Sequence, residues 1–196
     1  MQACRIDAHD LSCRRGDRIL FKGLSFALDQ GQALQVAGSN GIGKSSLIRI
    51  LAGLLRPFSG TVETTGAIGL VDERPALDPH HSLGKALEFW AGLDGTDQER
   101  CDTMMRKVGL SSLLDVPVRY LSTGQRKRAA LARLLIQGPA IWLLDEPLNG
   151  LDTHAVRLVE GLIADHCAGG GLALVASHQP IALPGVQQID LAGFAA

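Results

Sequence analysis

The sequence predicts one α/β domain that is built around a mostly parallel β-sheet. Short apolar segments of strand character alternate along the chain with helical patterns. One of these segments, Ile141–Leu144, is apolar throughout, as expected of a parallel strand that is covered on both faces. The chain has 196 residues, 46% of them hydrophobic, which is enough for a single domain with a substantial core.

Several segments have the composition of strands. In chain order they are Leu24–Leu28, Ala33–Ala37, Ala67–Val71, Ile141–Leu144 and Leu172–Ala176. Directly after the second segment, Leu47, Leu51 and Leu54 recur on one face of a helix. This helix is expected to end between Gly53 and Pro57, because glycine and proline both interrupt helical structure.

The middle of the chain predicts a helical insertion, at about residues 78–125, in a single domain that spans residues 1–196. Leu83, Leu87 and Trp90 fall on one face of a first helix. The pattern Thr96-x-x-Glu99 predicts a capping box that opens the next helix. Because this segment is helical and more polar than its surroundings, we expect an insertion within one α/β core rather than an independent domain.

The composition excludes several classes of protein. A formal net charge of −1 leaves no basic excess of the kind that electrostatic binding to nucleic acid requires, so no nucleic-acid partner is expected. The basic clusters at residues 14–18 and 126–128 are interpreted as solvated faces. The four cysteines contain no C-x-x-C pair, which argues against a zinc site and a disulfide framework and favours a reducing compartment.

No segment is expected to enter a membrane. The N-terminus is too polar for a signal peptide, and no apolar run approaches the ~20 residues of a membrane-spanning helix. We therefore expect no direct membrane insertion and a cytoplasmic location. If the protein works at a membrane, another chain must hold it there.

A phosphate-binding loop is the first motif that indicates function. Residues 38–45 fit the pattern G-x-x-x-x-G-K-[S/T] between a predicted strand and a predicted helix, which is the setting of a P-loop. Glycines let successive N–H groups turn towards phosphate, and the helix N-terminus adds its positive dipole end. Lys44 is expected to reach the β- and γ-phosphates and Ser45 to ligate Mg²⁺. The nucleotide-binding residues predicted here are Gly38, Ser39, Asn40, Gly41, Ile42, Gly43, Lys44, Ser45 and Ser46.

Two acidic residues directly follow the apolar segment at 141–144. The C-terminal end of a buried strand lies at the sheet edge where α/β proteins bind ligands. Asp145 is expected to hold Mg²⁺ through water, and Glu146 to polarise the attacking water. Alone, the pair would fit an exposed turn before Pro147 equally well, but beside a P-loop the catalytic interpretation is favoured.

The stretch Leu121–Gln125, LSTGQ, precedes a basic, alanine-rich helix and lies shortly before the acidic pair. It resembles the LSGGQ signature of the ATP-binding cassette (ABC) ATPases, although Ser122-x-x-Gln125 would also serve as the capping box of any helix. Leu148–Asp152 occupies the D-loop position of that family, and His178 matches its switch histidine. On these motifs, which occur in the family's order, the chain is identified as a member of the ABC ATPases.

The resemblance implies a P-loop NTPase fold of the ABC type, with a mostly parallel core sheet, an antiparallel N-terminal β part and an inserted helical subdomain. It implies ATP and Mg²⁺ as cofactors, and a second copy of the chain in a head-to-tail dimer. The catalytic residues would be Lys44, Glu146 and His178, and the metal ligands Ser45 and Asp145. From one copy, Ser122, Gly124 and Gln125 would bind the ATP that the other copy holds, because a helix N-terminus favours phosphate in trans as it does in cis.

Three positions depart from the pattern of the family. Glu73 replaces the Q-loop glutamine, and its carboxylate is still a ligand type for Mg²⁺. The aromatic residue that stacks on adenine falls at Arg14, whose guanidinium plane can also stack, although an ordinary surface arginine fits the position as well. Thr123 replaces the first of the two glycines of the LSGGQ signature, where its side chain is expected to face the dimer interface and slow closure.

A narrower resemblance is carried by residues 11–14 and 38–41, by Trp142 and by the stretch His178-Gln179-Pro180. Together with the short chain, these features resemble the ATP-binding subunits of the bacterial heme exporter of cytochrome c maturation. That resemblance implies a peripheral subunit at the cytoplasmic face of the inner membrane, with CcmB, CcmC and CcmD as membrane partners. Its ATP hydrolysis would drive release of a heme-loaded chaperone. The chain has no heme-ligation motif, so no heme site is assigned to it.

Three alternatives stay open at this point. The chain could be the ATPase subunit of an ABC transporter for another substrate, which only the partner proteins would reveal. It could be a soluble ABC protein that acts on ribosomes or nucleic acid, although such proteins usually carry two cassettes. Glu73 and Thr123 suggest a non-hydrolysing scaffold, and Glu146 and His178 argue against one.

Overall fold

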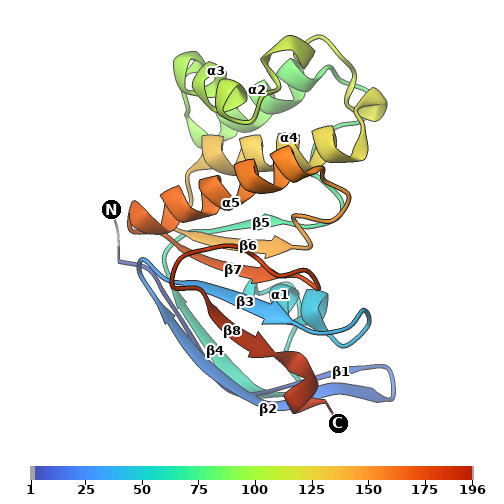
Figure 1. Cartoon of the computed structure of the whole chain (residues 1–196), viewed down its shortest axis with the longest axis vertical. Helices are drawn as coiled ribbons and strands as arrows, with labels where there is room; N and C mark the ends of the chain where they lie inside the picture. Colours follow the sequence, from blue (N-terminus) through green and yellow to red (C-terminus); the bar gives the residue numbers. More distant parts are fainter. Residues whose placement is uncertain (1–2, 196) are drawn as a thin grey trace.

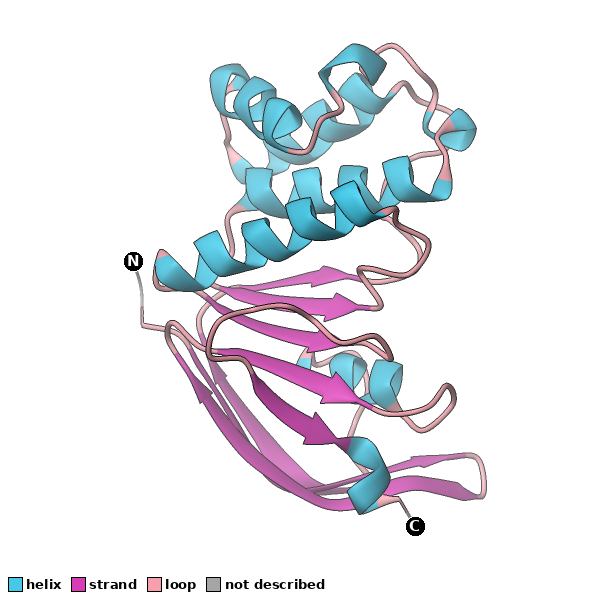
Figure 2. Cartoon of the chain, viewed as in Figure 1, coloured by secondary structure: helices cyan, strands magenta, loops and turns pink. Residues whose placement is uncertain are grey.

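A five-stranded parallel sheet lies at the centre of the structure, a computed structural model that describes residues 3–195 (Figures 1 and 2). Its strand order is β5-β6-β7-β3-β8, and every neighbouring pair is parallel. The strands are β3 (Ala33–Ala37), β5 (Ile68–Val71), β6 (Ile141–Asp145), β7 (Leu172–Ala176) and β8 (Gln187–Asp190). Every residue of β6 and β7 is buried, which explains their nearly continuous apolar composition.

A three-stranded antiparallel sheet, in the order β2-β1-β4, curves along one side of the parallel sheet (Figure 1). Its strands are β1 (Arg5–Arg15), β2 (Arg18–Asp29) and β4 (Ser59–Thr65). Arg15 pairs with Arg18 across a two-residue turn, in which Gly16 has a positive φ of 58°. Primed hairpin turns require such a left-handed backbone, so the glycine sets the position of this hairpin.

Helix α1 (Lys44–Leu51) follows β3 and lies between the two sheets. Its buried residues Leu47 and Leu51 share one core with the inner faces of β1 and β2. Ile141 of β6 belongs to this same core, whereas its neighbour Trp142 belongs to the core on the opposite face. Because successive side chains of a strand point to opposite faces, one buried strand connects both cores.

The opposite face of the parallel sheet is covered by helices α4 (Thr123–Gln137) and α5 (Thr153–Ala168) (Figure 1). Helices α2 (Leu83–Asp94) and α3 (Gln98–Lys107) pack on α4 and form a layer further from the sheet. The short 3-10 helices are η1 (Ser111–Leu113), η2 (Val118–Tyr120) and η3 (Leu191–Phe194). Among the described residues, none of the helices is both long and apolar enough to cross a lipid bilayer.

The predicted α/β class, with a parallel core sheet and an antiparallel N-terminal part, is confirmed. Strands β3 and β7 have the predicted bounds, and the segment predicted at 24–28 is part of the longer β2. Strands β1, β4 and β8 were not predicted. The bounds of the helical insertion, at about 78–125, stay a prediction, since α4 begins inside that range and continues to Gln137.

The predicted capping box at Thr96 is wrong. The N-cap of α3 is Asp97, whose side chain accepts a hydrogen bond of 2.8 Å from the backbone N–H of Arg100. Thr96 instead donates its hydroxyl to the carbonyl of Ile136. Threonine and aspartate both cap helices well, and here the residue one position later does so. Met1 and Gln2, which open the stretch judged too polar for a signal peptide, lie outside the described residues.

Candidate nucleotide-binding site

The loop between β3 and α1 carries the predicted phosphate cradle. Gly41 and Gly43 both have positive φ, at 79° and 123°. A Cβ at Gly43 would lie 3.0 Å from the Phe21 ring, so only glycine fits between the loop and β2. A Cβ at Gly41 would meet no atom within 4 Å, which leaves that backbone open on the side where a ligand can approach.

Lys44, the first residue of α1, folds back over its own loop. Its side chain is almost completely buried, at 5% exposure. The ammonium donates hydrogen bonds to the carbonyls of Gly38, at 2.8 Å, and Ser39, at 3.3 Å. It also lies 3.2 Å from Glu146 Oε1, an ionic contact that does not have hydrogen-bond geometry. A buried ammonium requires such partners, and phosphate oxygens could take their place.

Glu146 follows β6 and has a backbone conformation that is rare outside glycine, with φ at 47°. Its N–H donates to the carbonyl of Ala176 at the end of β7, at 2.8 Å. Its carboxylate lies between two cationic or titratable groups, with Oε1 near Lys44 and Oε2 at 2.8 Å from His178 Nδ1. The structure therefore brings together the three residues predicted as catalytic.

Asp145 is the last residue of β6 and is only 6% exposed. Burial raises the pKa of its carboxyl, although a hydrogen bond with the Ser45 side chain opposes this rise. Its Oδ1 atom is buried and has no hydrogen-bond partner among the described residues. An acceptor-only group beside the P-loop serine, with a free lone pair, is therefore available to a ligand.

A cavity of about 260 Å³ lies over the P-loop. Glu73 lines this cavity together with Ser45 and Glu146, so the residue in the Q-loop position faces the nucleotide site. Leu20 of β2 also lines it and was not predicted. The sequence pattern of a strand does not distinguish an apolar residue that lines a binding site from one that packs in the core. The lining residues are Leu20, Asn40, Gly41, Gly43, Lys44, Ser45, Ser46, Glu73 and Glu146.

The signature residues begin α4 and do not line the P-loop cavity. Ser122 accepts a hydrogen bond from the N–H of Gln125 at 3.2 Å, and the Gln125 side chain accepts one from Ser122 N–H at 2.8 Å. The capping box is therefore present in full. A Cβ at Gly124 would lie 3.4 Å from Leu151, so the signature is packed against the predicted D-loop.

Arg14 lies on β1, near the P-loop helix but outside the cavity. Its guanidinium group stacks on the exposed ring of Phe58, 4.6 Å from the ring centroid. The preceding residue, Cys13, forms a hydrogen bond with Ser46 that partly offsets the rise that burial causes in the pKa of its thiol. Arg14 thus makes a cation–π contact with an aromatic ring, and its predicted contact with adenine stays a prediction.

The basic cluster at 126–128 is not the solvated face that was expected. Arg126 donates to the carbonyl of Leu121, at 2.9 Å, and Arg128 donates to that of Val108, also at 2.9 Å. Between them, Lys127 donates to the main-chain carbonyl of Glu146. The cluster therefore fixes the start of α4 to its surroundings, and Lys127, which was not among the predicted site residues, contacts the site.

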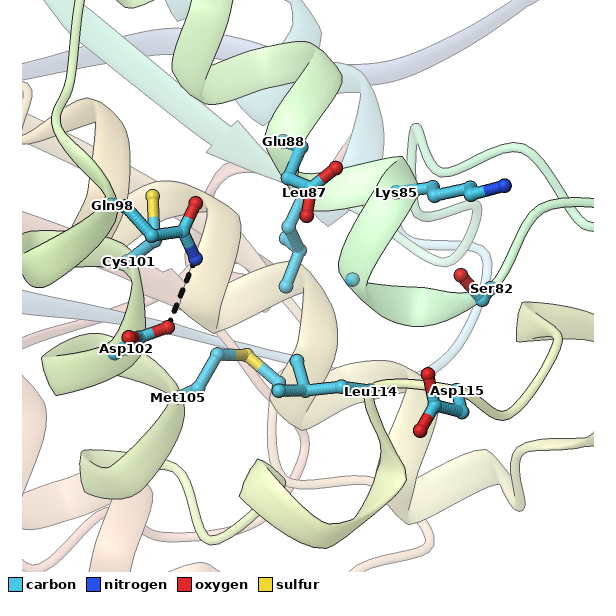
Figure 3. Close-up of a pocket in the computed structure, with 11 residues that line it drawn as sticks. Ser82, Lys85, Leu87, Glu88, Gln98, Cys101, Asp102, Met105, Leu114 and Asp115 are labelled. Carbon is cyan, nitrogen blue, oxygen red and sulfur yellow. Dashed lines mark hydrogen bonds between the residues drawn. The ribbon is translucent and has the colours of Figure 1, made fainter.

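A second cavity, of about 300 Å³, lies between α2 and α3 (Figure 3). Leu87 and Met105 point into it, and the Gln98 amide donates to Asp102 at 3.0 Å on its rim. None of the residues predicted to bind nucleotide or metal lines this cavity. The candidate site is therefore the cleft over the P-loop.

Comparisons with known proteins agree with this geometry. The ABC transporter family model matches residues 21–149. A cytochrome c biogenesis ATP-binding export protein, CcmA, from Novosphingobium aromaticivorans is 57% identical over 194 residues, with 99% of each chain covered. The protein of the same name from Zymomonas mobilis is 50% identical, with 98% of this chain and 86% of the relative covered. Among solved structures, the chain matches cbiO1 from Clostridium perfringens with a TM-score of 0.74 and 27% identity. That protein is described as part of the ABC transporter complex cbiONQ. The match covers 89% of this chain and 78% of cbiO1.

Proposed function

This chain belongs to the ABC transporter family and, within it, to the cytochrome c biogenesis ATP-binding export proteins, and from that premise we propose that it powers the heme exporter of cytochrome c maturation. As an ABC-type ATPase it binds ATP. Its hydrolysis of ATP would drive release of the heme-loaded chaperone. The observation that carries the proposal is the contact of Glu146 with both Lys44 and His178 above a P-loop.

In the proposed reaction, the chain's own residues bind phosphate and activate water. The P-loop N–H groups and the N-terminus of α1 attract the phosphates. Phosphate oxygens compete with Glu146 and the loop carbonyls for Lys44. Glu146 then orients and polarises the attacking water, while the hydrogen bond from His178 fixes its carboxylate.

The residues over the P-loop fit a Mg²⁺ ion. Mg²⁺ prefers oxygen ligands, and the unpartnered Asp145 Oδ1 is such a ligand beside the Ser45 hydroxyl. Glu73 adds a third oxygen donor from the cavity that Ser45 also lines. When bound, the ion would neutralise charge on the β- and γ-phosphates. We propose Ser45, Asp145 and Glu73 as its protein ligands, the last two directly or through water.

The remaining nucleotide contacts are proposed to come from a second copy and from Arg14. Ser122, Gly124 and Gln125 lie at the start of α4 and do not line the P-loop cavity of the same chain, so a head-to-tail partner would bring them to its ATP. Arg14, held against Phe58, would present its free face to adenine.

The proposed assembly includes membrane proteins. ATP-binding subunits of ABC transporters work with membrane components, and we propose CcmB, CcmC and CcmD for this chain. Its proposed location is the cytoplasmic face of the bacterial inner membrane, as a peripheral subunit. Among the described residues there is no helix that could span the bilayer, so membrane attachment would depend on those partners.

The test is the covalent heme content of c-type cytochromes in cells that lack this gene. The strain is complemented with the wild-type chain or with Glu146→Gln, and cytochromes are separated on gels and stained for heme. We expect staining to return only with the wild type. Normal staining in the deletion strain would reject the role in cytochrome maturation. Full rescue by Glu146→Gln, expressed at the wild-type level, would reject the requirement for hydrolysis.

A further inference from the structure

Lys127 joins the signature helix to the catalytic turn of the same chain. It lies in the second turn of α4, five positions after Ser122, and is half-buried. Its ammonium donates to the main-chain carbonyl of Glu146, across a sequence separation of 19 residues. No other side chain among the described residues donates to this carbonyl in the structure.

That carbonyl belongs to a residue whose backbone needs external support. Glu146 has a left-handed φ of 47°, which is unfavourable for a residue with a Cβ and persists only where neighbouring contacts impose it. On one side its N–H is held by the carbonyl of Ala176. On the other side, its carbonyl accepts two hydrogen bonds. One is a long bond of 3.4 Å from the Asn149 N–H within the turn, and the other comes from the Lys127 ammonium. Lys127 therefore supplies the stronger of the two contacts that fix this carbonyl.

The orientation of that peptide group determines where the carboxylate points. The Cα–Cβ direction of Glu146 follows from its φ and ψ angles, and the side chain then reaches Lys44 on one oxygen and His178 on the other. Rotation towards the ordinary right-handed region would turn the carboxylate away from the P-loop. A small misplacement of a catalytic group is enough to reduce a rate greatly.

Three carboxylates near Lys127 attract its ammonium group and favour its charged form. Burial lowers the pKa of Lys127, and attraction to Glu146, Glu73 and Asp145 opposes that change. The group thus carries its positive charge towards three carboxylates of the nucleotide site. Lys127 could instead serve only to neutralise this acidic cluster, and variants of Glu73 distinguish that role from a positioning role.

We propose that Lys127 is a positioning residue for hydrolysis, which holds the main chain of Glu146 in its left-handed conformation and so ties the signature helix to the catalytic carboxylate. This inference rests on the proposed role of Glu146. It also means that a displacement of α4 would be transmitted to the catalytic turn of its own chain.

The test compares Lys127→Met with Lys127→Arg in the full chain, purified with the membrane proteins that accompany it. Lys107→Met is the matched control, because Lys107 is a helical, exposed lysine that forms no hydrogen bond or ion pair among residues 3–195. We expect Lys127→Met to lower kcat for MgATP by about tenfold or more, as loss of a charge-assisted hydrogen bond to the catalytic turn implies. The affinity for ATP, measured at equilibrium without turnover, should stay within about twofold. Lys127→Arg should recover most of kcat.

A second pair of variants distinguishes the two roles of Lys127, which are positioning the Glu146 main chain and neutralising the nearby carboxylates. Glu73→Gln removes one of the carboxylates that face Lys127, and it is compared with the double variant Glu73→Gln/Lys127→Met. Positioning predicts the same fold-loss of kcat from Lys127→Met in both backgrounds. Equal activity of Glu73→Gln and the double variant would overturn the proposal in favour of charge balance.

Two further outcomes would also overturn it. One is a wild-type kcat in a folded Lys127→Met protein, with folding checked by its thermal unfolding curve. The other is a loss that appears only as weaker ATP binding. Glu146→Gln is measured in parallel: if it abolishes hydrolysis while Lys127→Met keeps the wild-type kcat, only this inference fails. If Glu146→Gln hydrolyses ATP normally, the proposed role of Glu146 fails as well.

Discussion

At the scale of single residues, burial determines which groups can perform chemistry. Lys44 and Asp145 are both nearly inaccessible to water, and each has a polar partner in the P-loop. Desolvation strengthens the electrostatic contacts of such groups and makes an unpaired one unfavourable. The Oδ1 atom of Asp145, which has no hydrogen-bond partner among the described residues, therefore indicates where a ligand can bind.

His166 shows the same principle away from the site. Its ring stacks on Trp142, with centroids 4.0 Å apart, and its Nε2 lies 3.2 Å from the carbonyls of both Ala140 and Leu172. Burial lowers the pKa of His166, although the two carbonyls oppose this. The folded chain therefore binds fewer protons at this site than the unfolded chain when the pH is below the unfolded pKa of about 6.5.

This pKa shift predicts a loss of stability in acid. The contribution of His166 to the free energy of unfolding should be complete above about pH 6.5 and should decrease as the pH falls below that value. His166→Phe keeps an aromatic ring beside Trp142 but cannot titrate. We expect the wild type to exceed this variant in stability at pH 7.5, and the difference to shrink at pH 5.5. Urea unfolding at both pH values measures it, and a difference that grows in acid would contradict the assignment.

At the scale of elements, α4 performs two tasks with one N-terminus. The capping box of Ser122 and Gln125 stabilises the helix, and the same residues are the proposed contacts to the ATP of a second copy. Helix α3 offers a comparison, because the Asp97 side chain likewise accepts a hydrogen bond from the third N–H of its helix and lies outside the proposed interface.

Removing each cap should separate stability from function. Ser122→Ala and Asp97→Ala should each lower the free energy of unfolding by about 1 kcal/mol, which corresponds to roughly 2–4 °C in Tm for a domain of this size. Only Ser122→Ala should also reduce the rate of ATP hydrolysis. This reduction should be much larger than the fraction of protein that its lower stability leaves unfolded. Differential scanning calorimetry and an ATPase assay on both variants decide this. Equal hydrolysis by the two variants would show that Ser122 is only a helix cap.

The elements also show how far sequence reasoning reaches. Strands β3 and β7 have the predicted bounds because both lie inside the parallel sheet and are apolar except for the buried Gln35 of β3. Strand β4 was missed because its outer position leaves it polar, with only Val62 partly buried. The P-loop and acidic pair were recognised because their chemistry demands particular residues in a particular order. Lys127 was missed because a hydrogen bond to a distant main-chain carbonyl leaves no pattern in the sequence.

At the scale of the whole molecule, the parallel sheet separates two cores and presents one edge to the nucleotide. The P-loop follows β3, the acidic pair ends β6, and His178 follows β7, so three neighbouring strands deliver the proposed machinery to one side. The signature residues begin α4 and face the predicted D-loop instead. In the proposed dimer, each copy would supply the P-loop half of one site and the signature half of the other, so a second copy would complete both sites.

The most direct test of this account is the oligomeric state of the Glu146→Gln chain in the presence of ATP, measured by size-exclusion chromatography with light scattering. We expect a dimer that dissociates when ATP is removed, because two intact sites would form without being hydrolysed. Lys44→Ala in the same background should stay monomeric. A Glu146→Gln chain that binds ATP but remains monomeric at every concentration tested would contradict the proposed ATP-bridged dimer.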